Sequence, residues 1–362
     1  MDKNWSDWMW QQTHAIKDFS QLKNQLPWVE NGLEATSAYF RLQITPYYLS
    51  LLDASNPEDP LAKICVPSLQ ELITSEQERV DPIGDRVNTD ELKHSPTDAI
   101  VHRYPDRCLL LLTPLCSSYC RYCFRREIVS KAENSVSADV LEKSFEYIKN
   151  TPQLREVILS GGDPLLLSDN KLAEVLHKLD GVKHLRSVRI HTRFPIFNPF
   201  RITDEFVKML SAFSRPMVLM LHVMHPREVT GEFKKAMAKL RKAGVVLLNQ
   251  SVLIKGCNDD VETLKELSYC LADCGIVPQY LHLLDLAKGT SHFRVSIEQA
   301  QKLMQELRGR ISGHLIPQLT LEIPGGYGKI PMETNYYQQL TKESYQLSSP
   351  HLPQKKINYR DL

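Results

Sequence analysis

Residues 108–123 read CLLLLTPLCSSYCRYC, a short, continuously apolar run that leads into three closely spaced cysteines. From this point onward, apolar runs that are too short for helices alternate with amphipathic stretches; the runs cover 108–113, 156–160, 187–191, 217–222, 245–254 and 280–284. Near-continuous apolarity is typical of strands that are buried on both faces. The alternation predicts a parallel sheet with right-handed crossovers, either a partial barrel or a doubly wound sheet.

The segments between these runs contain residues that begin and end helices. Ser296 stands at a predicted helix start, and Gly244 and Gly275 stand where glycines commonly end helices. A seventh apolar run, 319–323, follows the last helical segment and leads into Pro-Gly-Gly-Tyr-Gly-Lys at 324–329. The α/β pattern therefore extends through most of the C-terminal two thirds of the chain.

The chain divides into three predicted parts. Residues 1–95 are interpreted as a mostly helical extension interrupted by prolines, residues 96–315 as the partial barrel, and residues 316–362 as a glycine-rich segment with a C-terminal tail. Beyond Asn335 the tail is rich in Tyr, Gln, Ser and Pro and shows no periodicity. We therefore expect an extended arm or a disordered segment there.

The composition excludes several classes of protein. The chain has 362 residues, and 44 Lys and Arg balance 43 Asp and Glu to give a net charge of +1. A nucleic-acid-binding protein would need a cationic surplus or patch, which a net charge of +1 does not indicate. No apolar run reaches the ~18–20 residues of a membrane span. The N-terminal residues MDKNWSDWMW do not show the basic and then apolar pattern of a secretory signal, so we do not expect one, and eight cysteines are too few for a disulfide scaffold. We expect a cytoplasmic protein with reduced thiols that binds neither nucleic acid nor a membrane.

The strongest chemical signal is the CxxxCxxC motif formed by Cys116, Cys120 and Cys123. Thiolates favour iron–sulfur clusters or zinc. A structural zinc takes four ligands, and no nearby His or Cys completes that set. Three thiolates on a four-iron cube leave one iron open for another molecule, so the motif predicts a 4Fe-4S cluster.

This motif, placed after the first strand of a six-fold βα array, resembles the signature of radical S-adenosylmethionine (SAM) enzymes. The resemblance implies a partial (βα)6 barrel of the TIM type, in which the open iron binds SAM and one electron cleaves SAM to a 5′-deoxyadenosyl radical. A second matching element directly follows the second strand, where it would bind SAM: Ser160, Gly161, Gly162 and Asp163. Glycines at a strand end let backbone groups approach a ligand closely.

Four further segments resemble the lysine 2,3-aminomutase family. They are HRYPDR at 102–107, CRYCFRR at 120–126, LNQSV at 248–252 and PGGYGK at 324–329. The short chain resembles the compact bacterial branch whose β-lysine product is attached to elongation factor P. The resemblance implies an isomerase that moves the α-amino group of L-lysine to the β carbon, with a 4Fe-4S cluster, SAM and pyridoxal 5′-phosphate (PLP).

The resemblance also implies roles for single residues around PLP and SAM. Lys329 matches the lysine that holds PLP covalently. Arg103, Tyr104 and Arg107 match residues around the PLP phosphate and ring, where arginine forks suit a phosphate and a tyrosine ring can stack on the pyridine. Gln250 matches a residue that reaches the SAM ribose. Without the resemblance, Lys329 would be interpreted as a solvated loop lysine and HRYPDR as a surface turn.

Three positions concern the substrate. Arg125 matches the arginine that pairs with the substrate α-carboxylate, and Asp285 and Glu322 match acidic positions that hold the distal ammonium of lysine. Two carboxylates at adjacent strand ends suit a cation and would repel a glutamate side chain. The family more often has Asp at the position of Glu322. From the residues alone, the acidic pair would be interpreted as part of an ion pair at the barrel mouth.

Other hypotheses stay open at this stage. The substrate could be another amino acid such as glutamate, or the chain could be a radical SAM enzyme in which Lys329 is only structural. A third hypothesis is an iron–sulfur electron carrier or scaffold without mutase activity. The mutase hypothesis implies an electron donor such as flavodoxin or ferredoxin and leaves a homo-oligomer open. Longer members of the family that the chain resembles bind a structural zinc through C-terminal cysteines; no cysteine follows Cys274 here, so we expect no zinc site.

Overall fold

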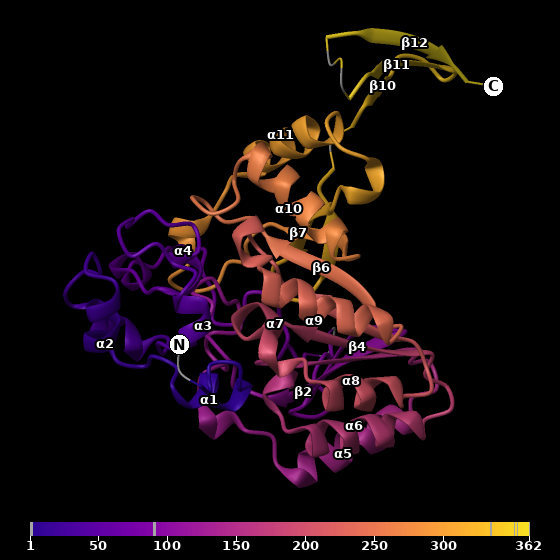
Figure 1. The fold of residues 1–362 in the computed structure, drawn as a ribbon. Helices are drawn as coiled ribbons and strands as arrows, with labels where there is room; N and C mark the ends of the chain where they lie inside the picture. The colour runs from indigo at the N-terminus through magenta and orange to yellow at the C-terminus, as the bar shows by residue number, and fades with distance from the viewer. Residues whose placement is uncertain (1–2, 90–91, 334, 351, 353, 362) are drawn as a thin grey trace.

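A computed structural model describes residues 3–89, 92–333, 335–350, 352 and 354–361, and a partial α/β barrel lies at its centre (Figure 1). Nine strands form one sheet in chain order. Strands β2 to β8 run parallel to one another, whereas β1 and β9 are antiparallel edge strands. The strands are β1 (Ile100–Tyr104), β2 (Arg107–Thr113), β3 (Glu156–Gly161), β4 (Ser187–Thr192), β5 (Met217–Leu221), β6 (Val246–Val252), β7 (Val277–His282), β8 (Gln318–Ile323) and β9 (Gly328–Pro331).

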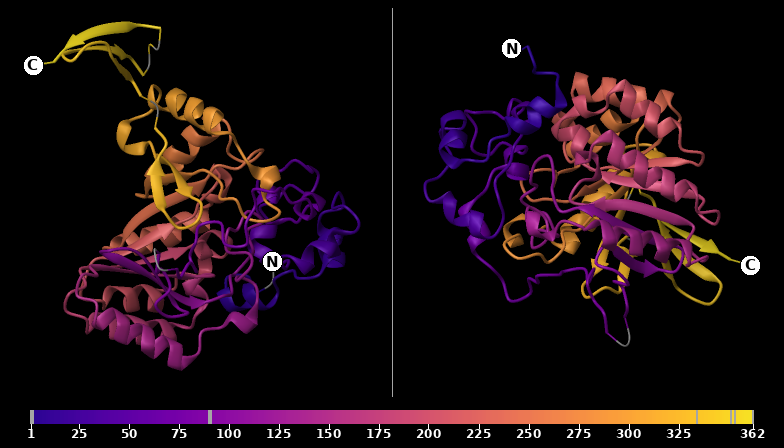
Figure 2. Two further views of the ribbon diagram at one scale, coloured as in Figure 1. Left: turned by 180° about the vertical axis from the view of Figure 1, so that it is seen from behind. Right: turned by 90° about the horizontal axis from the view of Figure 1, so that it is seen from below.

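Helices follow the parallel strands and cover the outer face of the sheet (Figure 2). They are α5 (Ala138–Lys149), α6 (Asp169–Asp180), α7 (Phe194–Phe197), α8 (Asp204–Ser211), α9 (Gly231–Lys242), α10 (Val261–Asp273) and α11 (Ile297–Arg308). Ser296 caps α11, and Gly244 and Gly275 follow α9 and α10 with positive φ, as predicted. Among the described residues, none of the helices is long and apolar enough to cross a membrane.

The seven predicted strands are confirmed, and the structure adds one strand at each edge of the sheet. HRYPDR is not an isolated surface turn, because Tyr104 and Arg107 are partners in the β1–β2 hairpin. Lys329 lies on strand β9 rather than in a loop, and it is the partner of Glu322 on β8. Gly325, with a φ of 91°, helps to turn the chain back after β8, a conformation that glycine adopts without strain.

The sheet is open between its edges β1 and β9, so the barrel is partial as predicted. Side chains connect the two edges. The hydroxyl of Tyr104 on β1 accepts a hydrogen bond of 3.0 Å from the backbone N–H of Lys329 on β9. Arg103 on β1 forms an ion pair with Glu322 on β8. Residues of the predicted site therefore also hold the open side of the barrel together.

The N-terminal extension lies beside the barrel, where Figure 1 shows it in indigo. Its α-helices are short and irregular segments join them, so the expectation of a mostly helical extension is only partly met: α1 (Trp8–Thr13), α2 (Phe19–Gln25), α3 (Pro46–Leu49) and α4 (Ala62–Cys65). The Trp8 ring packs edge-on against Phe194, with centroids 6.0 Å apart. The Tyr48 hydroxyl donates a 2.6 Å hydrogen bond to Glu228.

The C-terminal tail is an arm made of strands, which agrees with the expected extended arm and not with the alternative of a disordered segment. It forms a small antiparallel sheet that projects from the barrel (Figure 1): β10 (Tyr337–Gln339), β11 (Ser344–Ser348) and β12 (Lys356–Arg360). The register places most of its apolar side chains on one face, namely Tyr337, Tyr345, Leu347, Ile357 and Tyr359. This period of two is hard to recognise in strands of only three to five residues.

Candidate active site

One cavity of about 420 Å³ lies at the carboxyl ends of the parallel strands. In parallel α/β folds, this end of the sheet is the usual place of ligand sites. All the residues that the sequence predicted for cofactors and substrate line this single cavity: Cys116, Cys120, Cys123, Ser160, Gly161, Gly162, Asp163, Gln250, Arg103, Tyr104, Arg107, Arg125, Asp285, Glu322 and Lys329. Residues separated by more than two hundred positions in the chain are thereby brought together.

The cysteine loop follows β2, and hydrogen bonds hold its backbone. The amide of Gln43 donates to the carbonyl oxygens of Cys116 and Ser117, both at 2.9 Å. Burial raises the pKa of Cys120 to about 11, so bound iron would have to displace the thiol proton. No three described His, Cys, Asp or Glu side chains are close enough to share a single metal ion. A four-iron cube is wider than one ion, so three thiols around a cavity suit a cluster.

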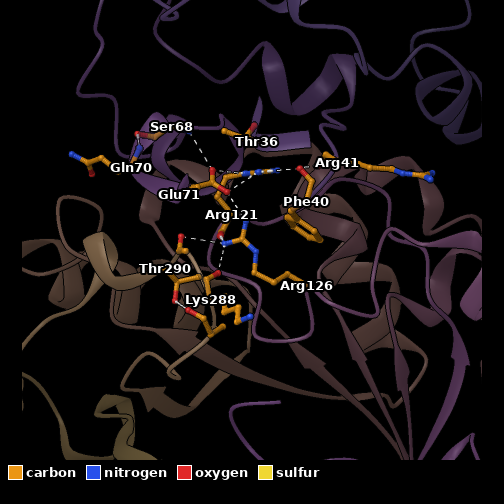
Figure 3. Close-up of polar contacts among 12 residues, drawn as sticks. Thr36, Phe40, Arg41, Ser68, Gln70, Glu71, Arg121, Arg126, Lys288 and Thr290 are labelled. Atoms are coloured by element: carbon orange, nitrogen blue, oxygen red, sulfur yellow. Dashed lines mark hydrogen bonds and ion pairs between the residues drawn. The ribbon is translucent and has the colours of Figure 1, made fainter. Parts of the chain in front are cut away.

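A buried ion triad fixes the cysteine loop to the rest of the molecule (Figure 3). Glu71 accepts hydrogen bonds of 2.8 and 2.7 Å from Arg121 and one of 2.5 Å from Arg126. Arg121 is 0% exposed, and its guanidinium also donates to the carbonyl oxygen of Arg41. Arg126 donates to the carbonyl oxygen of Lys288, in the loop after β7. The triad thus joins the extension, the cysteine loop and the far side of the barrel mouth.

Replacing Glu71 with alanine is expected to lower the free energy of unfolding by about 3–5 kcal/mol, because two buried arginines lose their partner. Denaturant unfolding followed by circular dichroism measures this loss. The exposed Glu76 is the matched control, and Glu76→Ala should change stability by less than about 0.5 kcal/mol. A Glu71→Ala variant as stable as the control would show that the triad does not hold the loop.

The Gly-Gly-Asp segment after β3 packs directly on the cysteine loop. A Cβ atom on Gly162 would lie 2.3 Å from the carbonyl oxygen of Leu115, so this close approach requires glycine. Asp163 accepts hydrogen bonds of 2.8 Å from the hydroxyl of Thr192 and from the backbone N–H of Arg193. Burial raises the pKa of Asp163 to about 6. Its carboxylate therefore fixes the ends of β3 and β4 against each other.

A chain of ion pairs crosses the cavity wall. Asp85 bridges two of the predicted arginines, Arg103 at 3.1 Å and Arg125 at 2.8 Å. Arg125 also donates a 3.0 Å hydrogen bond to the hydroxyl of Ser160. Sequence analysis missed Asp85 because it lies in an irregular segment that has no periodicity to mark a buried carboxylate.

Lys329 and Asp285 are ionisable groups in an environment that disfavours their charged forms. Burial lowers the pKa of Lys329, although Glu322 and Asp285 act in the opposite direction. Burial, together with the charge of Glu322, raises the pKa of Asp285 to about 7. The amine of Lys329 lies 4.7 Å from the centroid of the Tyr280 ring. A lowered pKa leaves more of the amine neutral and therefore nucleophilic.

Three histidines that the sequence analysis did not select also line the cavity: His282 on β7 and the pair His191 and His222. Burial lowers the pKa of His222 to about 3 and that of His191 well below its usual value, so both rings are neutral. The amide of Gln250 lies 2.6 Å from Nε2 of His222 and can donate to it. His191 and His222 are each the last residue of a predicted strand, and this position at the carboxyl end is a signal that could have identified them.

Several buried polar atoms of the cavity wall have no hydrogen-bond partner within the described residues. They are the Nε atoms of Arg103, Arg189 and Arg193, Nε2 of His191 and the hydroxyl of Tyr122. Buried polar groups normally have partners, so unpaired ones in a cavity suit a bound polar ligand. Three of the five belong to arginines, which fit the anionic groups of SAM and PLP.

Comparisons with known proteins agree with this geometry. Residues 110–267 match the family model described as the radical SAM superfamily. The chain is 41% identical over 338 residues to L-lysine 2,3-aminomutase of Clostridium subterminale, covering 92% of this chain and 80% of that protein. It is 38% identical to L-lysine 2,3-aminomutase of Escherichia coli (92% and 96% covered) and 35% identical to glutamate 2,3-aminomutase of Clostridioides difficile (92% and 78% covered).

Proposed function

Because the chain belongs to the lysine 2,3-aminomutase family of radical SAM enzymes, we propose that it moves the α-amino group of L-lysine to the β carbon. The observation that carries this proposal is the single cavity that contains the cysteine motif, Lys329 and the acidic side chains. When bound, the cluster and SAM supply a radical that removes a hydrogen atom, and PLP supplies the carbonyl that carries the migrating nitrogen. The modification of elongation factor P is the proposed use of the β-lysine.

The cofactor groups are proposed to divide the cavity between them. The three cysteines would hold the cluster, and residues 160–163, with Gln250, would bind SAM. Lys329 would hold PLP, whose phosphate would lie between Arg103 and Arg107. Arg107 is well placed for this, since its only ion pair with a described residue is with the exposed Asp106, and its guanidinium lies 3.9 Å from the Tyr104 ring centroid.

The distal ammonium of lysine is proposed to bind at Asp285. Glu322 already forms an ion pair with Arg103, so part of its negative charge is already balanced. Asp285 is partly buried, and its carboxylate forms no ion pair within the described residues. A lysine ammonium would supply the missing positive charge, whereas a glutamate carboxylate would meet two like charges. Arg125, oriented by Asp85 and Ser160, would bind the α-carboxylate.

A parallel incubation of candidate amino acids tests this function. Reconstituted enzyme with SAM, PLP and dithionite is given L-lysine, L-glutamate, L-arginine or L-ornithine, and the β-isomers are separated by chromatography and mass spectrometry. We expect β-lysine as the main product and no β-glutamate above the level without enzyme. Faster isomerisation of glutamate than of lysine would refute the substrate assignment and leave the radical chemistry in place.

The rate of lysine capture, kcat/KM, is expected to rise with pH through about 7. The pKa of Asp285 is raised, so the side chain is neutral below pH 7 and becomes the carboxylate that pairs with ammonium above it. In Asp285→Asn this rise should disappear, and kcat/KM should fall by about two to four orders of magnitude, which corresponds to the ~3–5 kcal/mol of a broken ion pair. The exposed Asp98→Asn serves as control and should keep the parent profile. An unchanged profile in Asp285→Asn contradicts the assignment.

A further inference from the structure

A second cavity of about 550 Å³ lies on the other side of the cysteine loop, between this loop and the N-terminal extension. Cys116 and Tyr119 line both this groove and the active-site cavity. The cysteine loop is therefore the wall that separates them. Gln12, Lys17 and Arg41 of the extension form part of the opposite side of the groove.

The charge of the groove is entirely positive. Lys17 and Arg41 are its only charged lining residues, and both are exposed. Neither side chain forms an ion pair or hydrogen bond with another described residue, whereas many other cations of this chain are paired with carboxylates. The whole chain has a net charge of only +1, whereas the described lining of this groove contains these two cations and no carboxylate.

We propose that this groove is the docking site of an acidic one-electron carrier protein of the flavodoxin or ferredoxin class. The inference rests on the proposed function, which requires that the cluster be reduced before SAM is cleaved. On the active-site side, the loop would face SAM, PLP and substrate, so the groove is the free side. In the transfer the carrier loses one electron and the cluster gains it, while no bond forms or breaks. Carboxylates of the carrier would pair with Lys17 and Arg41.

Hydrogen bonds connect the groove wall directly to the cysteine loop. Gln12 donates to the hydroxyl of Ser117 at 2.7 Å, and Gln43 donates to the carbonyl oxygens of Cys116 and Ser117. Electron tunnelling weakens steeply with distance, so a carrier must approach the cluster closely. A carrier seated in this groove would be separated from the irons mainly by the Cys116 segment. These bonds also keep that segment in place during docking.

Reversing the charge of the groove tests the proposal. Reconstituted holoenzyme carrying Lys17→Glu and Arg41→Glu is mixed with reduced flavodoxin at low salt, and cluster reduction is followed by stopped-flow absorbance. We expect the rate to fall about tenfold or more, because electrostatic steering dominates such encounters. Reduction by dithionite and iron content should equal those of the parent. The parent rate with flavodoxin should fall with added salt more steeply than that of the variant.

The matched control carries Lys183→Glu and Arg186→Glu, which are the same substitutions on exposed residues between α6 and β4, at the amino ends of the strands. It should keep the parent rate with flavodoxin. Equal loss in both double variants, or no loss in the groove variant, would overturn the proposal. Slower reduction of the groove variant by dithionite would also overturn the proposal, because the substitutions would then disturb the cluster itself rather than the docking of flavodoxin.

Cross-linking provides a readout that is independent of turnover. A carbodiimide joins lysine amines directly to carboxylates, so oxidised flavodoxin should be linked at Lys17 in the parent and not in the groove variant. Linkage at other lysines only would contradict the site. Cluster reduction does not need lysine as substrate. A parent enzyme that flavodoxin reduces rapidly but that does not isomerise lysine would overturn the proposed function and support the docking site.

Discussion

Replacing Cys120 with alanine is expected to remove the iron and all cleavage of SAM. Three thiolates can hold a four-iron cube in one orientation, but two cannot fix it, and no other described His or Cys lies in the motif to replace the lost ligand. Iron analysis and electron paramagnetic resonance of the reconstituted protein measure the cluster, and 5′-deoxyadenosine formation measures cleavage. Activity should fall below detection rather than by a fixed factor.

Cys270→Ala is the control for the general effect of losing a thiol. Cys270 lies on α10, is only partly buried and does not line the cavity, so its loss should leave iron content unchanged. A Cys120→Ala protein that keeps its cluster and cleaves SAM would contradict the radical mechanism. It would favour a protein in which the three cysteines only pack against the residues around them.

Much of the fold could be predicted because buried parallel strands are marked by nearly continuous apolar runs. The run at 108–113 became β2, and the cysteines that follow it became one wall of the cavity. Parallel strands bring their carboxyl ends to the same side, so residues at those ends could be grouped before any geometry was known. Strand β7 begins and ends earlier than predicted, because Val277 and Pro278 pair with β6 although they interrupt the apolar pattern.

Other features of the site depend on partners that no local pattern identifies. Asp85 and Glu71 lie in irregular or 3-10 segments, and their importance comes from arginines far along the chain. The pairing of Glu322 with Arg103 likewise follows from the meeting of the two barrel edges. It changes the substrate hypothesis, because the predicted acidic pair now has unequal members and Asp285 becomes the main candidate for the ammonium.

Replacing Lys329 with alanine is expected to abolish covalent attachment of PLP and all isomerisation, while iron content stays at the parent level. Lys329 is the lysine that the cavity brings between Tyr280 and the acidic side chains, and its lowered pKa favours the neutral, nucleophilic amine. Borohydride reduction followed by peptide mapping measures which lysine carries PLP. The exposed Lys255→Ala is the control for unspecific labelling and should keep the parent map.

This substitution separates the role of the amine from a role in folding. The bond to Tyr104 uses the backbone N–H of Lys329, so alanine keeps the contact that joins the two barrel edges. The variant should therefore unfold at nearly the parent denaturant concentration and still accept an electron from dithionite. PLP trapped at another cavity residue in Lys329→Ala would show that β9 only closes the barrel. Loss of PLP together with an intact, reducible cluster would instead mean that the two cofactors occupy independent halves of one cavity, joined only through the substrate.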